Sequence, residues 1–271
     1  MRYAVIGGDR RFAHLARMLE KAGYPTTGFL LEKAGMPSVP LSEIGKCSAV
    51  ICNWPLRWPL SDKEVKEKEI LDQLAPGTTL LLCGPKYPAE KRWDLQYVNL
   101  WADERLLQEN AWLTAEGAVA SAVSRTGLPI MGRSCAIVGY GRIGRALTEI
   151  LLKLGGEVTV FSRTEAKRKL ARESGAKTEG LAEIEESIHT YDVIFSTPPS
   201  VVLNGEVLKR AKSDTLILDL ASPPYGVDLD AARKLGLRAL REPGLPGRYC
   251  PLSAARAIYN AVLRWEEENH G

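Results

Sequence analysis

Short runs of apolar residues alternate with amphipathic segments along most of the chain. This alternation is the pattern of β-α units in parallel sheets. The runs are Tyr3–Ile6, Thr27–Leu31, Ala49–Asn53, Thr79–Cys83, Cys135–Val138, Glu157–Phe161, Asp192–Ser196 and Leu216–Leu220. Several are apolar at nearly every position, as expected for strands that helices cover on both faces. The series occurs twice, so we expect an α/β protein with two doubly wound, Rossmann-like domains built on parallel sheets.

Two helical segments are expected to join these domains. Residues 102–127 have a helical pattern with breaks near Asn110 and at Gly127. The last segment begins at Pro251, and proline is common at the first position of a helix. We expect a substrate-binding, flavodoxin-like or Rossmann-like domain at 1–110, a connecting helix at 111–130 and a dinucleotide-binding domain at 131–250. A terminal helix at 251–271 is expected to pack back on the first domain. Ligands of such sheets bind beyond the carboxyl ends of the strands, which predicts a ligand cleft between the domains where the connecting helices cross.

Composition and charge exclude several classes of protein. Hydrophobic residues make up 45% and charged residues 25% of the chain, as in ordinary soluble domains. The 36 basic and 33 acidic side chains leave a net charge of +3, which argues against a general nucleic-acid binder. No apolar run approaches the roughly 18 residues of a membrane span, and the first residues lack a signal-peptide pattern. The five cysteines include no Cys-x-x-Cys pair, which favours free thiols in a cytoplasmic protein over a metal site.

A glycine-rich motif follows the first strand of the second series and opens an amphipathic helix. In this context Gly-x-Gly-x-x-Gly is the fingerprint of dinucleotide-binding loops. The first glycine allows the tight turn, the second lets the backbone approach a pyrophosphate, and the third lets helix and strand pack closely. The helix N-terminus then offers free N–H groups to the anion. The predicted cofactor loop comprises Gly139, Tyr140, Gly141, Arg142, Ile143 and Gly144.

The end of the next strand indicates which dinucleotide binds. NAD sites usually carry an acidic residue there, which binds the ribose 2′-hydroxyl. This chain has Ser162, Arg163 and Thr164 instead, so a guanidinium and two hydroxyls are available for a 2′-phosphate. The sequence therefore predicts NADP(H), with Arg163 as the principal contact. Lys167 and Lys169 further along are interpreted as solvated helix residues.

Two more strand ends are expected to border the nicotinamide. Thr197 and Pro198 follow one strand, and Ala221 and Ser222 follow another. Proline-rich turns are also common as structural stops, so the assignment depends on position alone.

The first domain offers candidates for a small anionic substrate. Gly8 and Arg11 lie where the first strand meets a helix, but Phe12 occupies the third glycine position, where a pyrophosphate would fit poorly. A helix N-terminus beside arginines suits a carboxylate, although surface arginines at a helix start explain the pattern equally well. In the connector, Thr114 is interpreted as an N-cap with Glu116 in the first turn, at a domain junction.

Arg248 precedes the terminal helix, where the chain returns to the same junction, and it is interpreted as a ligand contact or as part of a hinge.

The three histidines, His14, His189 and His270, do not lie at strand ends. A histidine acid for carbonyl reduction therefore has no candidate, which argues against a 2-hydroxy-acid dehydrogenase.

Five stretches, in the expected order along nearly the whole chain, resemble the family of dipicolinate synthase A subunits from spore-forming bacteria. They are Ala4–Asp9 with Arg11, Thr114–Gly117, Val138–Gly144, Thr215–Pro223 and Pro243–Gly247. The resemblance implies a two-domain fold, NADP binding and oxidation of a dihydrodipicolinate to dipicolinate (pyridine-2,6-dicarboxylate) in sporulation. It also implies a second, flavoprotein-like chain, the B subunit of dipicolinate synthase. The chain departs from the family after Pro223, where Pro224-Tyr225-Gly226 replaces a pair of glycines.

A substrate with two carboxylates needs two cationic or N–H-rich anchors. On this interpretation Arg11 with the Gly8 loop supplies one anchor, and Thr114 or Arg248 supplies the other. Glu116 is the candidate proton acceptor, although helix capping explains it almost as well. Two alternatives stay open: an NADPH-dependent reductase of another small carboxylic acid, and a non-catalytic, regulatory subunit that binds NADP. Formation of a homo-oligomer also stays open, and no metal, nucleic acid or membrane is expected.

Overall fold

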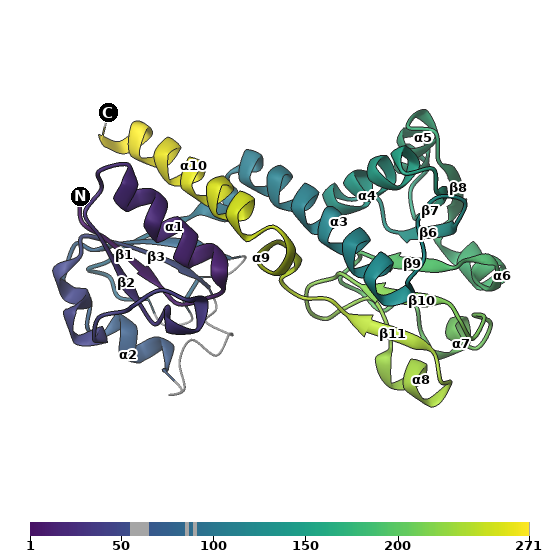
Figure 1. Cartoon of the computed structure of the whole chain (residues 1–271), viewed down its shortest axis with the longest axis horizontal. Helices are drawn as coiled ribbons and strands as arrows, with labels where there is room; N and C mark the ends of the chain where they lie inside the picture. Colours follow the sequence, from purple (N-terminus) through teal and green to yellow (C-terminus); the bar gives the residue numbers. More distant parts are fainter. Residues whose placement is uncertain (55–64, 85–86, 89–90, 271) are drawn as a thin grey trace. The chain divides into compact units, whose positions relative to one another are not determined.

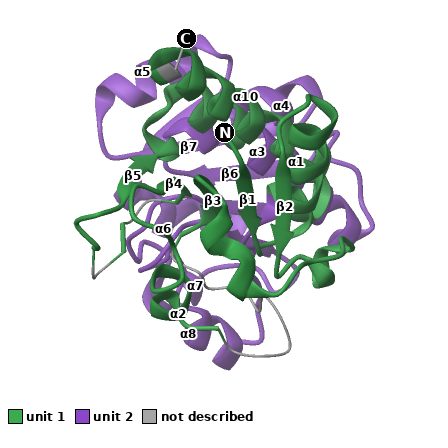
Figure 2. Cartoon of the chain, turned by 90° about the vertical axis from the view of Figure 1, so that its left-hand side faces the viewer, with its two compact units in different colours: residues 1–110, 246–271 green, residues 111–245 purple. Residues whose placement is uncertain are grey.

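The computed structural model describes residues 1–54, 65–84, 87–88 and 91–270. The chain divides into two compact units, which Figure 2 shows in different colours. Unit 1 contains Met1–Asn110 and Pro246–Gly271, and unit 2 contains Ala111–Leu245. The chain passes from unit 1 to unit 2 within helix α3 (Glu104–Thr126) and returns within the short helix α9 (Leu245–Tyr249).

Unit 1 is built on a parallel sheet (Figure 1), and its strand order is β2-β1-β3-β4-β5 (Figure 2). The strands are β1 (Tyr3–Ile6), β2 (Thr26–Phe29), β3 (Ala49–Asn53), β4 (Thr79–Cys83) and β5 (Gln96–Asn99). Alternate residues of β1 enter different cores, because successive side chains of a strand point to opposite faces. Tyr3 and Val5 pack with α1 (Arg10–Lys21) and α10 (Pro251–His270). Ala4 and Ile6 pack with α2 (Glu67–Leu71) and the 3-10 helix η2 (Leu41–Lys46). The helix at the end of the chain thus belongs to the core of unit 1. The 3-10 helices η1 (Glu32–Ala34) and η3 (Leu100–Ala102) complete this unit.

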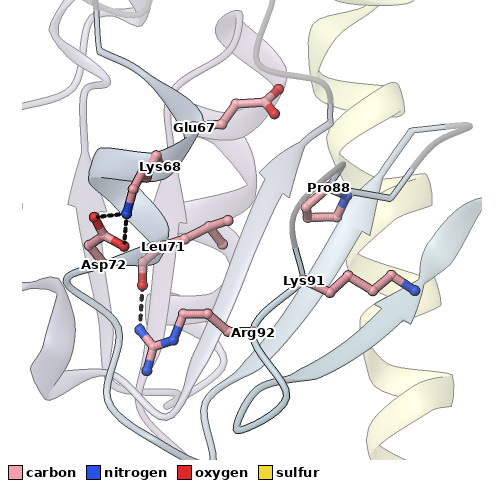
Figure 3. A pocket seen from close by; sticks show the side chains of 7 residues that line it. All are labelled: Glu67, Lys68, Leu71, Asp72, Pro88, Lys91 and Arg92. Carbon is pink, nitrogen blue, oxygen red and sulfur yellow. Dashed lines mark hydrogen bonds and ion pairs between the residues drawn. The ribbon is translucent and has the colours of Figure 1, made fainter.

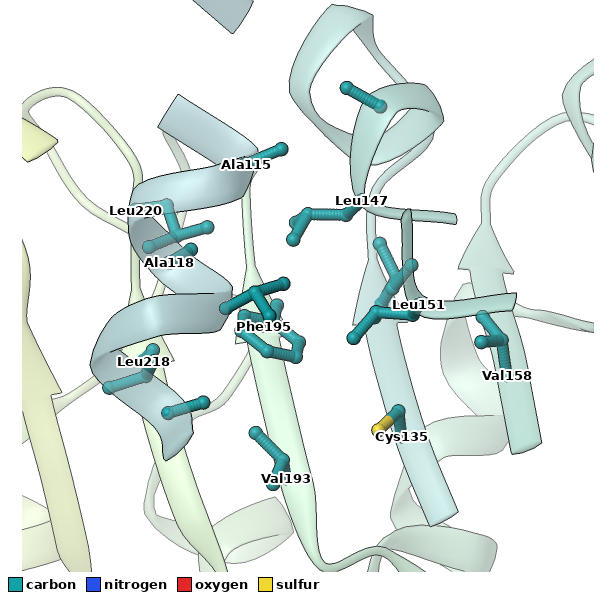
Figure 4. Packing of buried hydrophobic residues seen from close by; sticks show 14 of the residues in the cluster. Ala115, Ala118, Cys135, Leu147, Leu151, Val158, Val193, Phe195, Leu218 and Leu220 are labelled. Atoms are coloured by element: carbon teal, nitrogen blue, oxygen red, sulfur yellow. The ribbon is translucent and has the colours of Figure 1, made fainter. Parts of the chain in front are cut away.

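Unit 2 is built on a parallel sheet with the order β11-β10-β9-β6-β7-β8. The strands are β6 (Ser134–Val138), β7 (Glu157–Ser162), β8 (Lys177–Gly180), β9 (Val193–Ser196), β10 (Leu216–Asp219) and β11 (Arg238–Arg241). On one face, α3 and α4 (Arg142–Lys153) pack on the central strands (Figure 4). The other face is covered by α6 (Ile184–Ser187), α7 (Gly205–Leu208) and α8 (Leu229–Lys234). Helix α5 (Glu165–Glu173) follows β7, and the 3-10 helices η4 (Leu181–Glu183) and η5 (Ile188–Thr190) flank α6.

The predicted fold class is confirmed, since every predicted apolar run overlaps a strand and both sheets are parallel. Three strands, β5, β8 and β11, are not among the predicted runs. Each lies at the edge of its sheet and contains no fully buried residue. An edge strand is covered less completely than a central one, so its sequence lacks the continuous apolar run. The cleft expected between the domains stays a prediction.

Two details predicted for the connector are wrong. Helix α3 runs through Asn110 without a break and ends before Gly127, whose φ of 68° is left-handed. Thr114 therefore lies inside the helix and is not an N-cap. The capping group is Asp103, whose Oδ1 accepts hydrogen bonds from the N–H groups of Arg105 (2.8 Å) and Leu106 (3.1 Å). The alanine-rich residues between Asn110 and Thr126 pack on the sheet of unit 2, and this burial extends the helix.

Asp103 also pairs with Arg264 of α10, and this double role predicts a measurable stabilisation of unit 1. Its Oδ2 accepts hydrogen bonds from Nε (2.8 Å) and Nη2 (2.5 Å) of Arg264. We expect Asp103→Ala to lower the free energy of unfolding in urea at pH 7 by about 2 kcal/mol, through loss of the cap and of the charged hydrogen bonds. Asp103→Asn, which keeps a capping oxygen, is expected to lose about half as much. Equal stability of Asp103→Ala and wild type would contradict this assignment.

The same residue predicts a pH dependence. Burial acts to raise the pKa of Asp103, but hydrogen bonds from Leu106 and Arg264 outweigh it and hold the pKa below its usual value. A carboxyl whose pKa is lower in the folded than in the unfolded protein stabilises the fold above the unfolded pKa of about 3.9. This contribution is lost as the pH falls through the folded pKa. The stability difference between wild type and Asp103→Asn is therefore expected to shrink on acidification below about pH 4.

Candidate functional site

Four neighbouring strands of unit 2 end at one edge of the sheet, where the predicted cofactor segments begin. The strands are in register near these ends: Val138 pairs with Phe161, the penultimate residue of β7, and with Ser196, and Ser196 pairs with Asp219. Because all strands are parallel, the segments that follow them meet at the same carboxyl edge. The segments beginning at Gly139, Ser162, Thr197 and Leu220 are thus brought together.

The three glycines of the loop after β6 have different surroundings. Gly139 has a φ of 90°, and a Cβ atom there would lie 2.5 Å from Oγ1 of Thr197. A Cβ atom on Gly144 would overlap the carbonyl oxygen of Gly139 and lie 3.1 Å from its carbonyl carbon. A Cβ atom on Gly141 would meet no described atom within 4 Å. The first and third glycines are therefore required by the fold, whereas the second leaves open space at the start of α4.

The remaining loop residues divide between core and surface. Tyr140 is buried in the core of unit 2, with its hydroxyl 3.2 Å from Oγ of Ser174, so only its backbone is available to a nucleotide. Ile143 packs against the same core. Arg142 is exposed in the first turn of α4, where the helix N-terminus favours an anion.

The segment after β7 presents a cation beside a carboxylate that is already paired. Ser162 is buried at the end of the strand, and Arg163 and Thr164 are exposed before α5. Nη2 of Arg163 donates a 3.1 Å hydrogen bond to Oγ of Ser200. The nearest acidic residue in sequence, Glu165, accepts hydrogen bonds from Arg172 and Arg168, which hold the pKa of its carboxyl below the usual range.

The segments after β9 and β10 are tightly held. Thr197 donates a 2.9 Å hydrogen bond from Oγ1 to the carbonyl of Val138, and Pro198 packs where a side chain on Gly139 would lie. Ala221 is buried, and its N–H donates to Oδ1 of Asp219 at 3.2 Å. Ser222 is exposed. Thr197 and Pro198 thus support the glycine loop, whatever contact they make with a ligand.

In unit 1, the loop after β1 is organised around an ion pair. Arg11 is only 8% exposed, and Nε and Nη2 of its guanidinium donate hydrogen bonds of 2.8 Å each to the two carboxylate oxygens of Asp9. Gly8 has a φ of 90° and lies against the ring of Phe12. A side chain on Gly247 would overlap the Asp9 carboxylate, so α9 lies against this loop. The Asp9 carboxylate therefore already binds Nε and Nη2 of the guanidinium that the sequence assigned to a substrate carboxylate.

The other candidates for substrate and catalysis lie on two helices. Thr114 is buried and Glu116 is exposed on α3, in unit 2. Arg248 is exposed on α9 in unit 1, with its guanidinium 5.4 Å from the ring centroid of Tyr249. The roles of these three residues stay predictions.

Two polar residues at the carboxyl edge of unit 2 were not predicted as site residues. Asp219 is fully buried; burial raises the pKa of its carboxyl, against the lowering effect of backbone N–H donors from Ala221, Gly226 and Val227. Arg241 ends β11 beside it, with Nε 3.7 Å from Oδ2 of Asp219. Position at the end of a strand was the available signal for Arg241, but β11 was itself missed.

A hollow of about 400 Å³ on unit 1 is lined by none of the residues predicted to bind ligands (Figure 3). Its walls are held by internal contacts: Lys68 pairs with Asp72, and Arg92 donates a 2.6 Å hydrogen bond to the carbonyl of Leu71.

Among the described residues no group of three or more potential metal ligands gathers, and no helix is both long and apolar enough to cross a membrane.

Comparisons with known proteins agree with this geometry. Residues 99–221 match the family model of the NAD binding domain of D-isomer specific 2-hydroxyacid dehydrogenases. Unit 2, which contains most of the matched residues, is thus a Rossmann-like NAD-binding domain. The match concerns this dinucleotide-binding part of such enzymes, so it is compatible with the lack of a histidine candidate for carbonyl reduction.

Similarity also extends over nearly the whole chain. The protein is 29% identical to the dipicolinate synthase A subunit of Bacillus subtilis (strain 168), over 97% of this chain and 95% of that protein. The crystal structure of the dipicolinate synthase A chain from Bacillus subtilis superposes with a TM-score of 0.79 at 26% identity, covering 99% of this chain and 96% of the other. The A subunit from Bacillus halodurans has the same fold, with a TM-score of 0.82 at 23% identity and coverage of 97% of both chains. These similarities support a nicotinamide-dependent oxidoreductase. The resemblance predicted from the sequence motifs is confirmed: the chain is similar to the A subunit of dipicolinate synthase over almost its entire length.

Proposed function

We propose that this chain is the NADP-dependent oxidoreductase subunit of a dipicolinate synthase, which oxidises dihydrodipicolinate to pyridine-2,6-dicarboxylate during sporulation. The observation that carries the proposal is the similarity to a dipicolinate synthase A subunit over 97% of the chain. The dinucleotide-binding geometry at the carboxyl edge of unit 2 supports it independently.

The reaction removes one hydride and one proton from a dihydropyridine ring and gains the aromaticity of pyridine. A bound nicotinamide supplies the hydride acceptor. What the protein must add is orientation of the ring and a proton acceptor, rather than a strong acid. Glu116 is our candidate for the proton acceptor, because its side chain is exposed on α3, where a carboxylate is accessible to a ligand.

We assign the cofactor as NADP(H) on electrostatic grounds. The exposed guanidinium of Arg163 follows β7, and the neighbouring Glu165 is neutralised by Arg168 and Arg172. A 2′-phosphate at this strand end therefore meets a cation rather than a carboxylate. The loop Gly139–Gly144 and the first turn of α4 receive the pyrophosphate in the same proposal.

The substrate contacts of unit 1 are proposed for the Gly8 loop and Arg248, with Thr114 contributing from unit 2. Arg11 positions this loop through Asp9.

The flavoprotein-like B subunit of dipicolinate synthase is the proposed partner, and a cytoplasmic location fits the free cysteines. The match to 2-hydroxyacid dehydrogenases favours, as a second candidate, an NADPH-dependent reductase of another small carboxylic acid.

Incubating the protein with the dihydrodipicolinate precursor and NADP, with and without the partner subunit, tests the proposal. The expected result is pyridine absorbance that rises in step with NADPH. Oxidation of NADPH by another small acid, without pyridine formation, would favour the reductase. If the protein binds NADPH but Glu116→Gln leaves product formation by the complex unchanged, the assignment of Glu116 is contradicted and the non-catalytic role gains support.

A further inference from the structure

A cationic side chain that no part of the proposed function uses lies at the ligand edge of unit 2. Arg241 is the last residue of β11 and is in register with Asp219 at the end of β10. Asp219 is in turn in register with Ser196 at the end of β9. These three residues therefore form one row along the carboxyl edge, and their side chains point to the same face of the sheet.

The guanidinium of Arg241 is held in place by an aromatic ring. Its central carbon lies 3.4 Å from the ring centroid of Tyr225, which is a close stacking contact. Tyr225 has a φ of 74°, a left-handed conformation that costs a non-glycine residue about 1 kcal/mol or more. The loop thus accepts backbone strain at the position that brings this ring against Arg241.

Asp219 holds the same loop through hydrogen bonds to its backbone. Its carboxylate accepts hydrogen bonds from the N–H groups of Ala221 (3.2 Å), Gly226 (3.2 Å) and Val227 (3.3 Å). Gly226 lies so close to Ser196 that a side chain there would overlap the Ser196 hydroxyl. The loop that positions Tyr225, and through it Arg241, is therefore rigidly defined.

The hydrogen-bonding capacity of Arg241 is not used up by these contacts. Among the described residues its buried Nε has no hydrogen-bond partner and forms only a long ion pair, of 3.7 Å, with Oδ2 of Asp219. Within the same described part of the chain, the hydroxyl of Ser196 is likewise buried without a partner. The Arg241 side chain is 33% exposed, so part of its guanidinium is accessible. Because the protein chain pairs this guanidinium so weakly, its accessible nitrogens can donate to an acceptor that the chain does not supply.

The position of Arg241 indicates what that acceptor is. In a dinucleotide fold the pyrophosphate lies at the glycine loop and the adenine ribose at the end of the next strand, which here are the ends of β6 and β7. The sheet order places β9, β10 and β11 on the opposite side of β6, where the nicotinamide and the substrate belong. We propose that Arg241, oriented by Tyr225, binds a carboxylate group of the substrate. This inference rests on the proposed function, and it adds a cationic anchor whose ion pair with Asp219, at 3.7 Å, is longer than the 2.8 Å pair between Arg11 and Asp9.

The test is the binding of dipicolinate to the full-length protein with NADPH bound, measured by calorimetry. We expect Arg241→Gln to weaken dipicolinate binding about tenfold, the effect of one charge-assisted hydrogen bond, and to leave the Kd of NADPH within about twofold. Arg233→Gln, which removes an exposed arginine from α8 of the same unit, is the matched control and is expected to change neither affinity. Arg241→Lys keeps the charge but not the planar stack, and is expected to lose about threefold.

Each outcome bears on the inference. Unchanged dipicolinate affinity in Arg241→Gln would overturn it and leave the proposed function standing. Equal losses for dipicolinate and NADPH would also overturn it, because they indicate a structural role. If wild type binds NADPH but no dipicolinate, the proposed function fails and the inference fails with it. Should Arg241→Gln not fold, Arg241→Lys carries the same comparison, and wild-type affinity in that variant would contradict the stacking geometry.

Discussion

Replacing Gly144 with alanine is expected to weaken NADPH binding at least 100-fold and to lower the free energy of unfolding by about 1–3 kcal/mol. The added methyl group would overlap the carbonyl oxygen of Gly139, and both are backbone-defined positions that no side-chain rotation relieves. The start of α4 must move away from β6, and this movement displaces the N–H groups that receive the pyrophosphate. Thermal unfolding and calorimetric titration with NADPH measure the two effects.

Gly141→Ala is the matched control, because the same methyl group is added three residues earlier. It would meet no described protein atom within 4 Å, so the unfolding temperature is expected to stay within about 2 °C of wild type. NADPH affinity is nevertheless expected to fall at least tenfold, since the methyl group fills the space through which the backbone approaches a pyrophosphate. Wild-type NADPH affinity in Gly141→Ala would contradict the placement of the cofactor at this loop.

Arg163→Ala is expected to weaken NADPH binding by about 30- to 100-fold and to leave NADH binding within about twofold. The two cofactors differ only in the 2′-phosphate, and hydrogen bonds to a charged group contribute about 2–3 kcal/mol. The guanidinium is exposed and is oriented by one hydrogen bond to Ser200, so it can turn towards a ligand with little cost to the fold. Titrations of both cofactors into both proteins measure this change in preference.

Lys167→Ala is the matched control for Arg163→Ala, because it removes one positive charge from the exposed surface of α5, close to the same strand end. It is expected to weaken NADPH binding no more than about twofold, as screened surface charges do. If the two variants lose NADPH affinity equally, the preference comes from general surface charge and not from a contact with Arg163. Equal affinity of wild type for NADPH and NADH would remove the role of Arg163 altogether.

The sequence predicted the fold where burial controls the amino-acid pattern. The central strands are covered on both faces, so their apolar runs were visible without any structure. The glycine loop was likewise predictable, because the steric requirements at Gly139 and Gly144 permit no other residue. Strands β5, β8 and β11 carry no such pattern, since none of their residues is fully buried.

Side-chain partnerships were the part that the sequence did not reveal. Arg11 was assigned to a ligand, but a local carboxylate, Asp9, reaches it first because the two residues lie together at the start of α1. Thr114 was interpreted as a helix cap, but packing on the sheet of unit 2 carries α3 through that position. Arg241 was overlooked because its proximity to Tyr225 and Asp219 depends on strand order, which no local pattern encodes.

The most direct test of the proposed cofactor site is a crystal structure of the protein with NADPH bound. We expect the pyrophosphate at the first turn of α4 beside Gly141, and the 2′-phosphate within hydrogen-bonding distance of Arg163. We also expect the nicotinamide on the β9 and β10 side of the sheet. An adenine ribose bound away from residues 162–164, with no contact between the pyrophosphate and the glycine loop, would contradict this cofactor site.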